Sequence, residues 1–291
     1  MGNLKEVRTR IASVSSTQQI TSAMKMVSAA KFRRAQNAIL TMRPYSAKLN
    51  EIIANIDVED GVETPYHRTG KTEKVLLVVI ASNKGLCGAF NSNVIKEASK
   101  RIAYYTEENN AELSLMTIGK RTTDFFTKRT SYVTDSFIDI LDKPTFDNIS
   151  EIAEIVMKRF CEKKYDKVEL IYNQFKNSLT QIVSIEQFLP VVTKKDNKTT
   201  APTIKSDYIF EPNKESILKE MIPLSLRSQF YRVLLDSLAS EHGARMTAMQ
   251  KATDNASELL KELRLTYNKA RQTAITNEII EIVSGAEALN G

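Results

Sequence analysis

A glycine-containing stretch is the part of this sequence best placed to bind an anion. Residues 82–91 read SNKGLCGAFN, follow an apolar run and open a stretch with helical periodicity. Backbone N–H groups at such a strand-to-helix turn can hold a phosphate group. However, the three-glycine spacing of a dinucleotide site is absent, and no acidic residue stands about twenty residues on at the end of a second strand. Nucleotide binding and a purely structural turn are both open interpretations of this stretch.

A second glycine motif, Gly70-Lys71-Thr72, resembles the end of a phosphate-binding loop. That loop requires a glycine five residues before Gly70, where this chain has Pro65. The motif also precedes the first apolar run, whereas a phosphate-binding loop follows a strand. We therefore interpret it as a turn in a linker.

The histidines and cysteines are too few to build a metal centre. His67 and His242 are the only histidines, and Cys87 and Cys161 are the only cysteines. A zinc site needs three or four such ligands, so we expect no metal and no cofactor, and we expect both thiols to be reduced and buried. No serine, cysteine or carboxylate pair is arranged for catalysis. The sequence therefore indicates a protein without catalytic residues.

The last quarter of the chain predicts one very long helix. Residues 224–290 contain no proline, and apolar or small residues recur every three to four positions, including Leu234, Leu238, Met246, Met249, Ala256, Leu259 and Leu263. Such a helix is about 100 Å long and cannot fit inside a compact domain. Because its apolar line is narrow, it needs another helix alongside.

The N-terminal residues predict the partner helix. Residues 3–43 carry an apolar stripe whose register slips after Gln18, as in an irregular coiled coil. Pro44 is expected to break or kink this helix, which then resumes in residues 45–56. Frequent alanine and serine permit close approach of another helix. We therefore expect the two ends of the chain to form an antiparallel pair.

The N-terminal helix is also strongly basic. Residues 1–48 contain nine lysine and arginine residues against one glutamate, a net +8 within a chain of net +6. This charge suggests an acidic protein surface, a nucleic acid or an anionic membrane face as partner. Aromatic residues are nearly absent from the helix and no DNA-binding module is recognisable. A coiled coil whose charges simply face solvent is the alternative.

Between the two helices the pattern changes to short apolar runs alternating with helical stretches. Strands are predicted at residues 75–81, 111–118, 168–173 and 181–188, and helices at 91–107, 121–129 and 148–164. This order predicts a small Rossmann-like α/β domain, with a mainly parallel sheet and one added antiparallel strand. Residues 194–206 are predicted to be a loop or flexible hairpin, and residues 208–210 an edge strand.

The predicted fold class is thus α/β plus a long coiled coil. Residues 1–57 form the N-terminal coiled-coil helix, residues 74–206 the inserted α/β foot domain, and residues 207–291 the C-terminal coiled-coil helix with a short lead-in. No apolar run is long enough to span a membrane. The N-terminus lacks the apolar core of a secretory signal, so we expect the protein to be made and kept inside the cell.

Both ends of the chain carry motifs of one known family. IASV at 11–14, TQQIT at 17–21, AMKMV at 23–27 and AAK at 29–31 closely resemble the start of the gamma subunit of F-type ATP synthase. ITNEIIEIVSGAEA at 275–288 resembles the C-terminal signature of that family. Residues 82–91, 207–212 and 241–254 also fit, so the resemblance covers essentially the whole chain.

The resemblance implies a central rotor shaft, present as one copy per complex and without bond chemistry of its own. In that family the coiled coil passes through a ring of three alpha and three beta subunits, and the foot rests with the epsilon subunit on a membrane ring of c subunits. Ion flow turns the ring and the shaft, and the asymmetric shaft drives each catalytic beta subunit through its states. The implied location is peripheral, at the cytoplasmic face of a bacterial plasma membrane.

The resemblance also implies contact residues. Arg271, Gln272, Thr276 and Glu278 match positions where the family's shaft engages the beta subunits, with Met24 and Lys25 on the opposing helix near the same level. Tyr208, Phe210 and Glu211 match the foot segment that touches the membrane ring, although the family often has tyrosine where Phe210 stands. We expect a polar outer surface on the shaft, because exposed ion pairs are weak, at about 0–1 kcal/mol each, and can be remade as the shaft turns.

The competing interpretation is a nucleotide-binding α/β protein. Its coiled coil would then be an arm for dimerisation or for nucleic-acid binding. ATP binding with turnover by the isolated chain would favour that enzyme, and a steep salt dependence of DNA affinity would favour the nucleic-acid arm.

Overall fold

The long helices predicted at the two ends are present. In the computed structural model, which describes residues 4–60, 65–68, 70–177, 180–191 and 214–290, α1 is Leu4–Asp60 and α5 is Lys214–Asn290. α1 continues through Pro44, and α5 begins before Pro223. Of the break or kink predicted at Pro44, the break is therefore wrong, and so is the predicted start at residue 224. A proline removes one backbone N–H from a helix, and tertiary packing of these two helices offsets that loss.

The described residues divide into two compact units. The first unit, residues 29–245, contains the α/β domain and the adjoining parts of α1 and α5. The second unit consists of the remaining parts of the two helices, residues 1–28 and 246–291.

The sheet of the first unit has five strands in the order β3-β2-β1-β4-β5. They are β1 (Lys74–Ile80), β2 (Glu112–Ile118), β3 (Val133–Phe137), β4 (Lys167–Phe175) and β5 (Gln181–Leu189). All neighbours are parallel except β4 and β5, which are antiparallel, so the predicted sheet type is confirmed. The sequence did not predict β3, because its residues VTDSF are largely polar and none of them is fully buried at this edge of the sheet.

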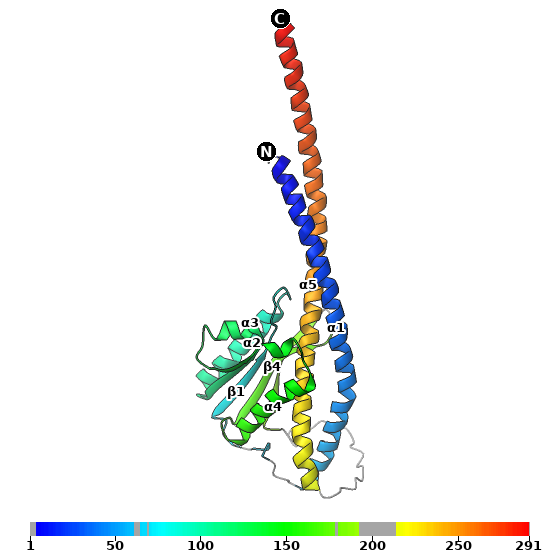
Figure 1. Ribbon diagram of the computed structural model, residues 1–291. Helices are drawn as coiled ribbons and strands as arrows, with labels where there is room; N and C mark the ends of the chain where they lie inside the picture. Colours follow the sequence, from blue (N-terminus) through cyan, green and yellow to red (C-terminus); the bar gives the residue numbers. More distant parts are fainter. Residues whose placement is uncertain (1–3, 61–64, 69, 178–179, 192–213, 291) are drawn as a thin grey trace. The chain divides into compact units, whose positions relative to one another are not determined.

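Helices cover both faces of this sheet (Figure 1). α2 (Phe90–Ala103) and α3 (Lys120–Phe126) pack on one face, while α4 (Phe146–Cys161) and part of α5 pack on the other. A π-helical turn, Tyr104–Glu108, follows α2, and a short 3-10 turn, Asp139–Leu141, lies between β3 and α4. In β1, alternate side chains enter the two cores: Val75, Leu77 and Val79 on the α2 side, and Leu76, Val78 and Ile80 on the α4 side. A strand buried on both faces reads as a continuous apolar run, and this is the run that predicted β1.

α5 contributes directly to the core of the α/β domain. Leu218, Ile222, Leu226, Phe230, Val233 and Leu234 are buried in the cluster formed by α4 and the sheet. The Phe230 ring lies 5.5 Å, centroid to centroid, from the ring of Phe188 in β5. The α5 side of the sheet is therefore closed by the same helix that pairs with α1.

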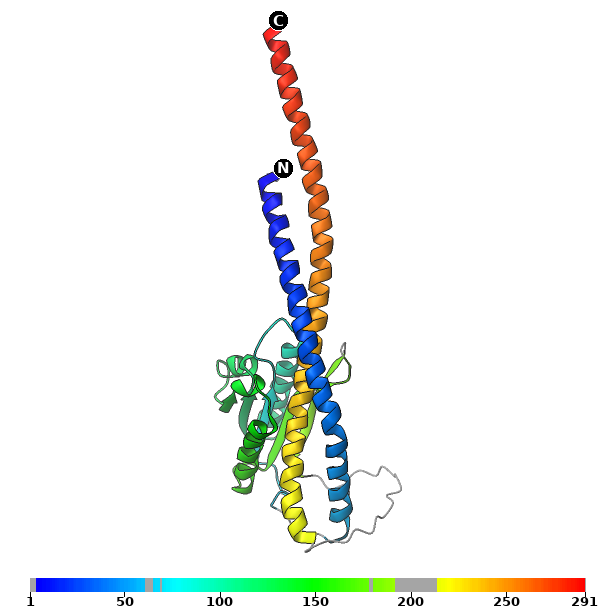
Figure 2. The same cartoon turned by 45° about the vertical axis from the view of Figure 1, so that its right-hand side comes forward.

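Within the first unit, α1 and α5 lie side by side and run in opposite directions (Figures 1 and 2). Ala35 and Ile39 of α1 share a small apolar cluster with Leu235 and Ala239 of α5. The two alanines allow close approach of the helices. The antiparallel pairing predicted from the sequence is therefore confirmed.

Gly119, between β2 and α3, tests how tightly this unit is built. Its φ is +103°, and a Cβ at this position would lie 2.2 Å from the carbonyl oxygen of Ala81. Because a backbone oxygen cannot move aside, Gly119→Ala is expected to lower the free energy of unfolding by about 2–4 kcal/mol. Gly70→Ala is the matched control, since no atom lies within 4 Å of its added Cβ. Chemical denaturation that gave both variants the same midpoint would contradict this packing.

Candidate functional site

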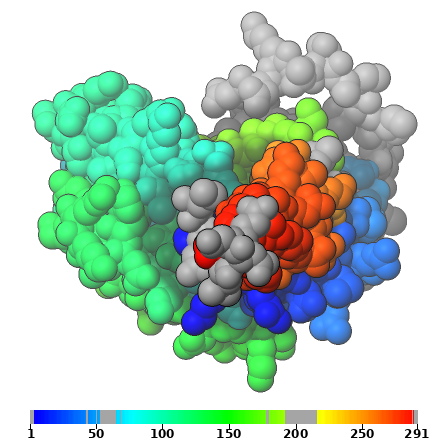
Figure 3. Space-filling model, turned by 90° about the horizontal axis from the view of Figure 1, so that it is seen from above, coloured from blue at the N-terminus to red at the C-terminus, as the bar shows by residue number. Residues whose placement is uncertain are grey.

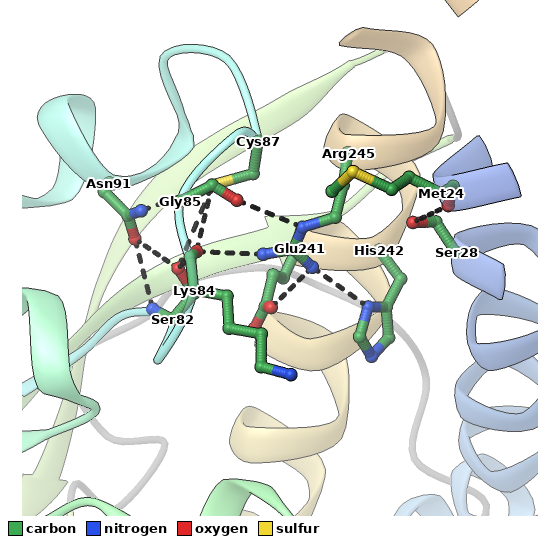
Figure 4. A network of polar contacts seen from close by, with 10 residues as sticks. All are labelled: Met24, Ser28, Ser82, Lys84, Gly85, Cys87, Asn91, Glu241, His242 and Arg245. Atoms are coloured by element: carbon green, nitrogen blue, oxygen red, sulfur yellow. Dashed lines mark hydrogen bonds and ion pairs between the residues drawn. The ribbon is translucent and has the colours of Figure 1, made fainter. Parts of the chain in front are cut away.

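The turn predicted as a possible anion site, residues 82–91, connects β1 to α2 and is held by its own polar groups (Figure 4). The backbone N–H of Ser82 donates to Asn91 Oδ1 at 3.1 Å, and Ser82 Oγ donates to the carbonyl oxygen of Lys84 at 2.6 Å. Asn91 Nδ2 in turn donates to Cys87 Sγ at 3.2 Å. These bonds cross the turn and make it a closed structure.

Arg245 of α5 binds the carbonyl side of this turn (Figure 4). Its Nη2 donates to the carbonyl oxygen of Lys84 at 2.9 Å, and its Nε donates to that of Gly85 at 3.2 Å. Its Nη1 donates to Glu241 Oε1, one helical turn earlier, at 2.7 Å. Because the turn directs carbonyl oxygens at a cation of its own chain, the structural interpretation is favoured over nucleotide binding. The turn attaches the α/β domain to α5.

Burial sets the electrostatics of this attachment. Glu241 is buried, which raises its pKa, and the charge of Arg245 opposes that rise. His242 is mostly buried beside Arg245, and its Nδ1 lies 3.3 Å from Arg245 Nη1. Burial, together with the charges of Arg245 and Lys31, lowers the pKa of His242 to about 4. His242 is therefore neutral at neutral pH.

Leu86, at the apex of the turn, is a feature that sequence reasoning missed. Its φ is +62°, in the left-handed region, and its side chain is 63% exposed. A strained backbone that presents an apolar side chain to solvent is more common at binding surfaces than elsewhere. The signal in the sequence was a leucine that directly follows Gly85 and precedes Gly88 by two positions, within a strand-to-helix turn.

The other predicted chemical motifs have simpler outcomes. Gly70 and Lys71 are exposed and precede β1, as expected for a linker turn. Among the described residues, no group of three or more His, Cys, Asp or Glu side chains could hold a metal ion.

Both cysteines are free, but Cys161 is exposed, so the expectation that both are buried is wrong for that residue. Cys161 ends α4, and only the opposite face of that helix packs against the sheet.

In the second unit, polar contacts between described residues join α1 to α5. Gln18 Nε2 donates to Ser257 Oγ at 2.6 Å, Thr253 Oγ1 donates to Thr21 Oγ1 at 2.9 Å, and Lys25 Nζ donates to Gln250 Oε1 at 2.6 Å. Residue numbers rise along α1 as they fall along α5, so this part of the pair is also antiparallel. In this register Leu4, the first described residue of α1, faces α5 near residue 271.

The four predicted contact residues of α5 are all exposed. They are Arg271, Gln272, Thr276 and Glu278. They lie at or beyond the level where the described part of α1 begins, and Figure 1 shows the C-terminal end of α5 continuing past it. Met24 and Lys25 are half-buried and do not lie at this level, contrary to the expectation. The partner of Lys25 is Gln250, about 21 residues before Arg271, or roughly 30 Å along the helix.

The surface around these four residues is less polar than expected. Ile275, Ile279 and Ile282 are 48%, 55% and 71% exposed, and Ile280 and Val283 are exposed as well. In the view from above, the C-terminal part of α5 is seen along the helix, with the start of α1 beside it (Figure 3). The prediction of a polar outer surface is therefore wrong for the end of α5. The sequence did contain a signal of this apolar surface: five of the nine residues at 275–283 are isoleucine or valine.

The predicted foot contacts cannot be placed in this structure. Tyr208, Phe210 and Glu211, the predicted edge strand at 208–210 and the predicted loop at 194–206 all lie outside the described residues.

Comparison with known proteins decides the family. A family model described as ATP synthase matches residues 3–289. The ATP synthase gamma chains of Flavobacterium johnsoniae and Cytophaga hutchinsonii are 55% and 51% identical to this chain, and each match covers 100% of both chains. The chain belongs to the ATP synthase gamma chain family. As a gamma chain it is a non-catalytic subunit of ATP synthase, as the resemblance at the two ends implied.

Solved structures agree with the fold. A chain of the central stalk of Tetrahymena thermophila mitochondrial ATP synthase matches with a TM-score of 0.59 and 28% identity, covering 80% of this chain and 99% of that one. A rotor chain of Euglena gracilis mitochondrial ATP synthase has a TM-score of 0.65 at 20% identity, covering 94% and 98%. This gamma chain thus has the fold of central-stalk subunits.

The contact between Arg245 and the turn should be a large contributor to the stability of this gamma chain. Arg245→Met leaves Glu241 buried without its cation and removes the donor that Arg245 provides to each of the two carbonyls, so the free energy of unfolding should fall by about 3–5 kcal/mol. Hydrogen exchange in residues 82–91 should also become faster. Lys100→Met, which breaks an exposed pair with Glu97, is the control and should cost at most about 1 kcal/mol. Equal losses in the two variants would contradict the assigned role of Arg245.

His242 should make the stability of the chain depend on pH. An unfolded histidine titrates near 6.5, whereas the folded pKa of His242 is about 4, so the folded chain binds this proton less tightly. Its contribution is complete above pH 6.5 and is lost as the pH falls towards 4, by about 2–3 kcal/mol. His242→Asn should remove that part of the slope in denaturation curves between pH 7 and pH 4.5. Parallel curves for the variant and the wild type would refute the assignment.

Proposed function

We propose that this ATP synthase gamma subunit is the rotating central shaft, and that the C-terminal tip of α5 engages the catalytic beta subunits. The tip is defined here as residues 271–283. The observation that carries the proposal is the exposure of the tip's isoleucine and valine side chains on a helix that continues past the described start of α1.

Exposed aliphatic residues on a single helix favour a surrounding partner. Full burial of an isoleucine or valine contributes about 1.5–3 kcal/mol, so leaving five of them in water is unfavourable without a partner. A ring of alpha and beta subunits around the tip supplies that cover. The apolar contact must remain modest at each position, because a shaft that turns has to leave each contact again.

The arrangement of the tip residues suits a rotor. At about 100° per residue, the five exposed aliphatic residues occupy an arc of roughly 160° around the helix, and Asn277, Glu281 and Ser284 lie on the opposite side. Three identical beta subunits would therefore meet three different surfaces at any one angle. Each surface favours a different conformation of the subunit that it contacts, so rotation moves every beta subunit through open, loose and tight states.

Four polar residues complete the proposed contact with the beta subunits. Arg271 and Glu278 border the aliphatic arc, while Gln272 and Thr276 lie within it. Neither Thr276 nor Glu278 hydrogen-bonds another residue in the described part of the chain, so both are free to bind a partner. Met24 and Lys25 lie farther along the helix pair. We propose that they form a separate contact with the catalytic ring, through the half-buried face of α1.

The basic start of the chain suits the same partners. Residues 1–48 carry a net +8, and exposed cations form weak contacts with acidic segments that can be remade at each step. We assign residues 1–57 and 207–291 to the shaft and residues 74–206 to the foot.

The foot is proposed to rest with the epsilon subunit on the c ring, through Tyr208, Phe210 and Glu211. The proposed location is peripheral, on the cytoplasmic face of a bacterial inner membrane. The bacterial origin of the two gamma chains named above supports it. None of the described helices has both the length and the apolar character needed to cross a bilayer.

The double variant Thr276→Ala/Glu278→Ala tests the tip. In the assembled complex it should lower ATP synthesis and the proton pumping coupled to hydrolysis several-fold. Removing exposed side chains should leave the melting temperature of the subunit within about 1–2 °C of the wild type.

A second double variant on the same helix is the control. Glu258→Ala/Thr266→Ala removes the same residue types from exposed positions in the part of α5 that pairs with α1. It should reduce coupling much less. Wild-type synthesis and pumping by the Thr276/Glu278 variant would reject the proposed contact, and so would equal losses in both variants.

A further inference from the structure

A small polar cavity interrupts the packing between α1 and α5 in the first unit. Its volume is about 120 Å³. Ser46 and Leu49 of α1 line one side, Glu186 of β5 lines another, and Ser225, Ser228, Gln229 and Arg232 of α5 close it. The cavity therefore lies where three elements of this unit meet.

Two serine hydroxyls in this cavity have no hydrogen-bond partner among the described residues. They are Ser46 Oγ and Ser228 Oγ, on side chains that are 8% and 1% exposed. Neither hydroxyl turns back to a carbonyl of its own helix, which is the usual solution for a serine within a helix. A buried hydroxyl without a partner costs about 1–3 kcal/mol, so two in one cavity require a ligand.

The cavity lies between two apolar layers. On one side, Ile39 and Leu235 belong to one apolar cluster, and on the other, Ile52 packs against the cluster that contains Leu218 and Ile222. The antiparallel register that joins Ala35 and Ile39 to Leu235 and Ala239 sets Ser46 opposite Ser228. The contact between α1 and α5 is therefore apolar before and after this layer, and at the layer itself two hydroxyl groups face each other.

The charged side chains at this layer are already paired. Glu186 Oε1 accepts from Arg232 Nη2 at 2.6 Å and from Gln229 Nε2 at 2.7 Å, and Glu186 Oε2 accepts from Tyr172 at 2.9 Å. Arg232 Nη1 also pairs with Asp236 Oδ2 at 3.6 Å, so each charged side chain that lines the cavity already has a partner of opposite charge. A neutral ligand that both donates and accepts hydrogen bonds fits better.

We infer that this cavity binds a cluster of ordered water molecules that bridges α1 to α5. At about 30 Å³ each, its volume holds about four waters. Ser46 and Ser228 each supply one donor and one acceptor, and carbonyl and carboxylate oxygens can supply further acceptors. At this layer the two helices are therefore joined by hydrogen bonds through water molecules, which can exchange with solvent, instead of by direct apolar contacts.

A high-resolution structure of the full chain or of the assembled complex tests the site directly. Ordered solvent peaks within 3.2 Å of both Ser46 Oγ and Ser228 Oγ are expected. An empty cavity, or a direct bond between the two hydroxyls that closes it, would overturn the inference. Xenon pressure gives a second test: a hydrated polar cavity should not take up xenon, whereas a dry one should.

A stability measurement on the full chain tests the bridging role. Ser46→Ala/Ser228→Ala removes the hydroxyls that hold the cluster, and the melting temperature should fall by about 2–4 °C relative to the control. The control is Ser16→Ala, an exposed serine of α1, which reports the gain in helix propensity that alanine brings. A dry cavity predicts the opposite sign, because alanine would then remove unsatisfied hydroxyls. A melting temperature equal to or above that of the control would overturn the inference.

Discussion

The packing of α5 against the sheet is the interaction on which the rest of the first unit depends. Leu218, Ile222, Phe230 and Leu234 fill the core that α4 begins, so the domain has no complete core without α5. The same stretch of helix turns Leu235 and Ala239 towards α1. One helix thus serves two interfaces, and this explains why its apolar residues exceed a simple coiled-coil seam. A helix buried on two sides cannot turn about its own axis within this unit.

The α/β domain has the architecture of nucleotide-binding folds, but the turn at the usual ligand site binds a helix of the same chain. In doubly wound folds, ligands bind at the carboxyl ends of the strands, and here the turn after β1 is at that place. The carbonyl oxygens of Lys84 and Gly85 instead bind the guanidinium of Arg245. Loss of either partner of the buried pair Glu241–Arg245 is costly, because the other charge is then left buried alone. The turn is therefore present, but its partner is a side chain of the same protein, Arg245.

The two helices of the pair are joined differently in the two units. In the first unit, small and apolar residues such as Ala35 and Ala239 dominate the contact. In the second unit, Gln18, Thr21 and Lys25 form direct polar contacts with α5. Polar contacts give register without requiring a large apolar core, which suits a slender helix pair. The tip beyond them presents exposed aliphatic side chains instead.

The sequence by itself determined the helices, the sheet type and the family. Apolar periodicity in residues 224–290 and the buried run of β1 are local signals, since each element must match its own burial pattern. Tertiary packing decided the rest. Pro44 and Pro223 remain inside helices because neighbouring elements hold them there, and β3 forms because β2 offers it an edge. The partner of Lys25 and the role of Arg245 depend on residues 160 or more positions away in the chain. Such contacts leave no local pattern, because only the folded chain brings their residues together.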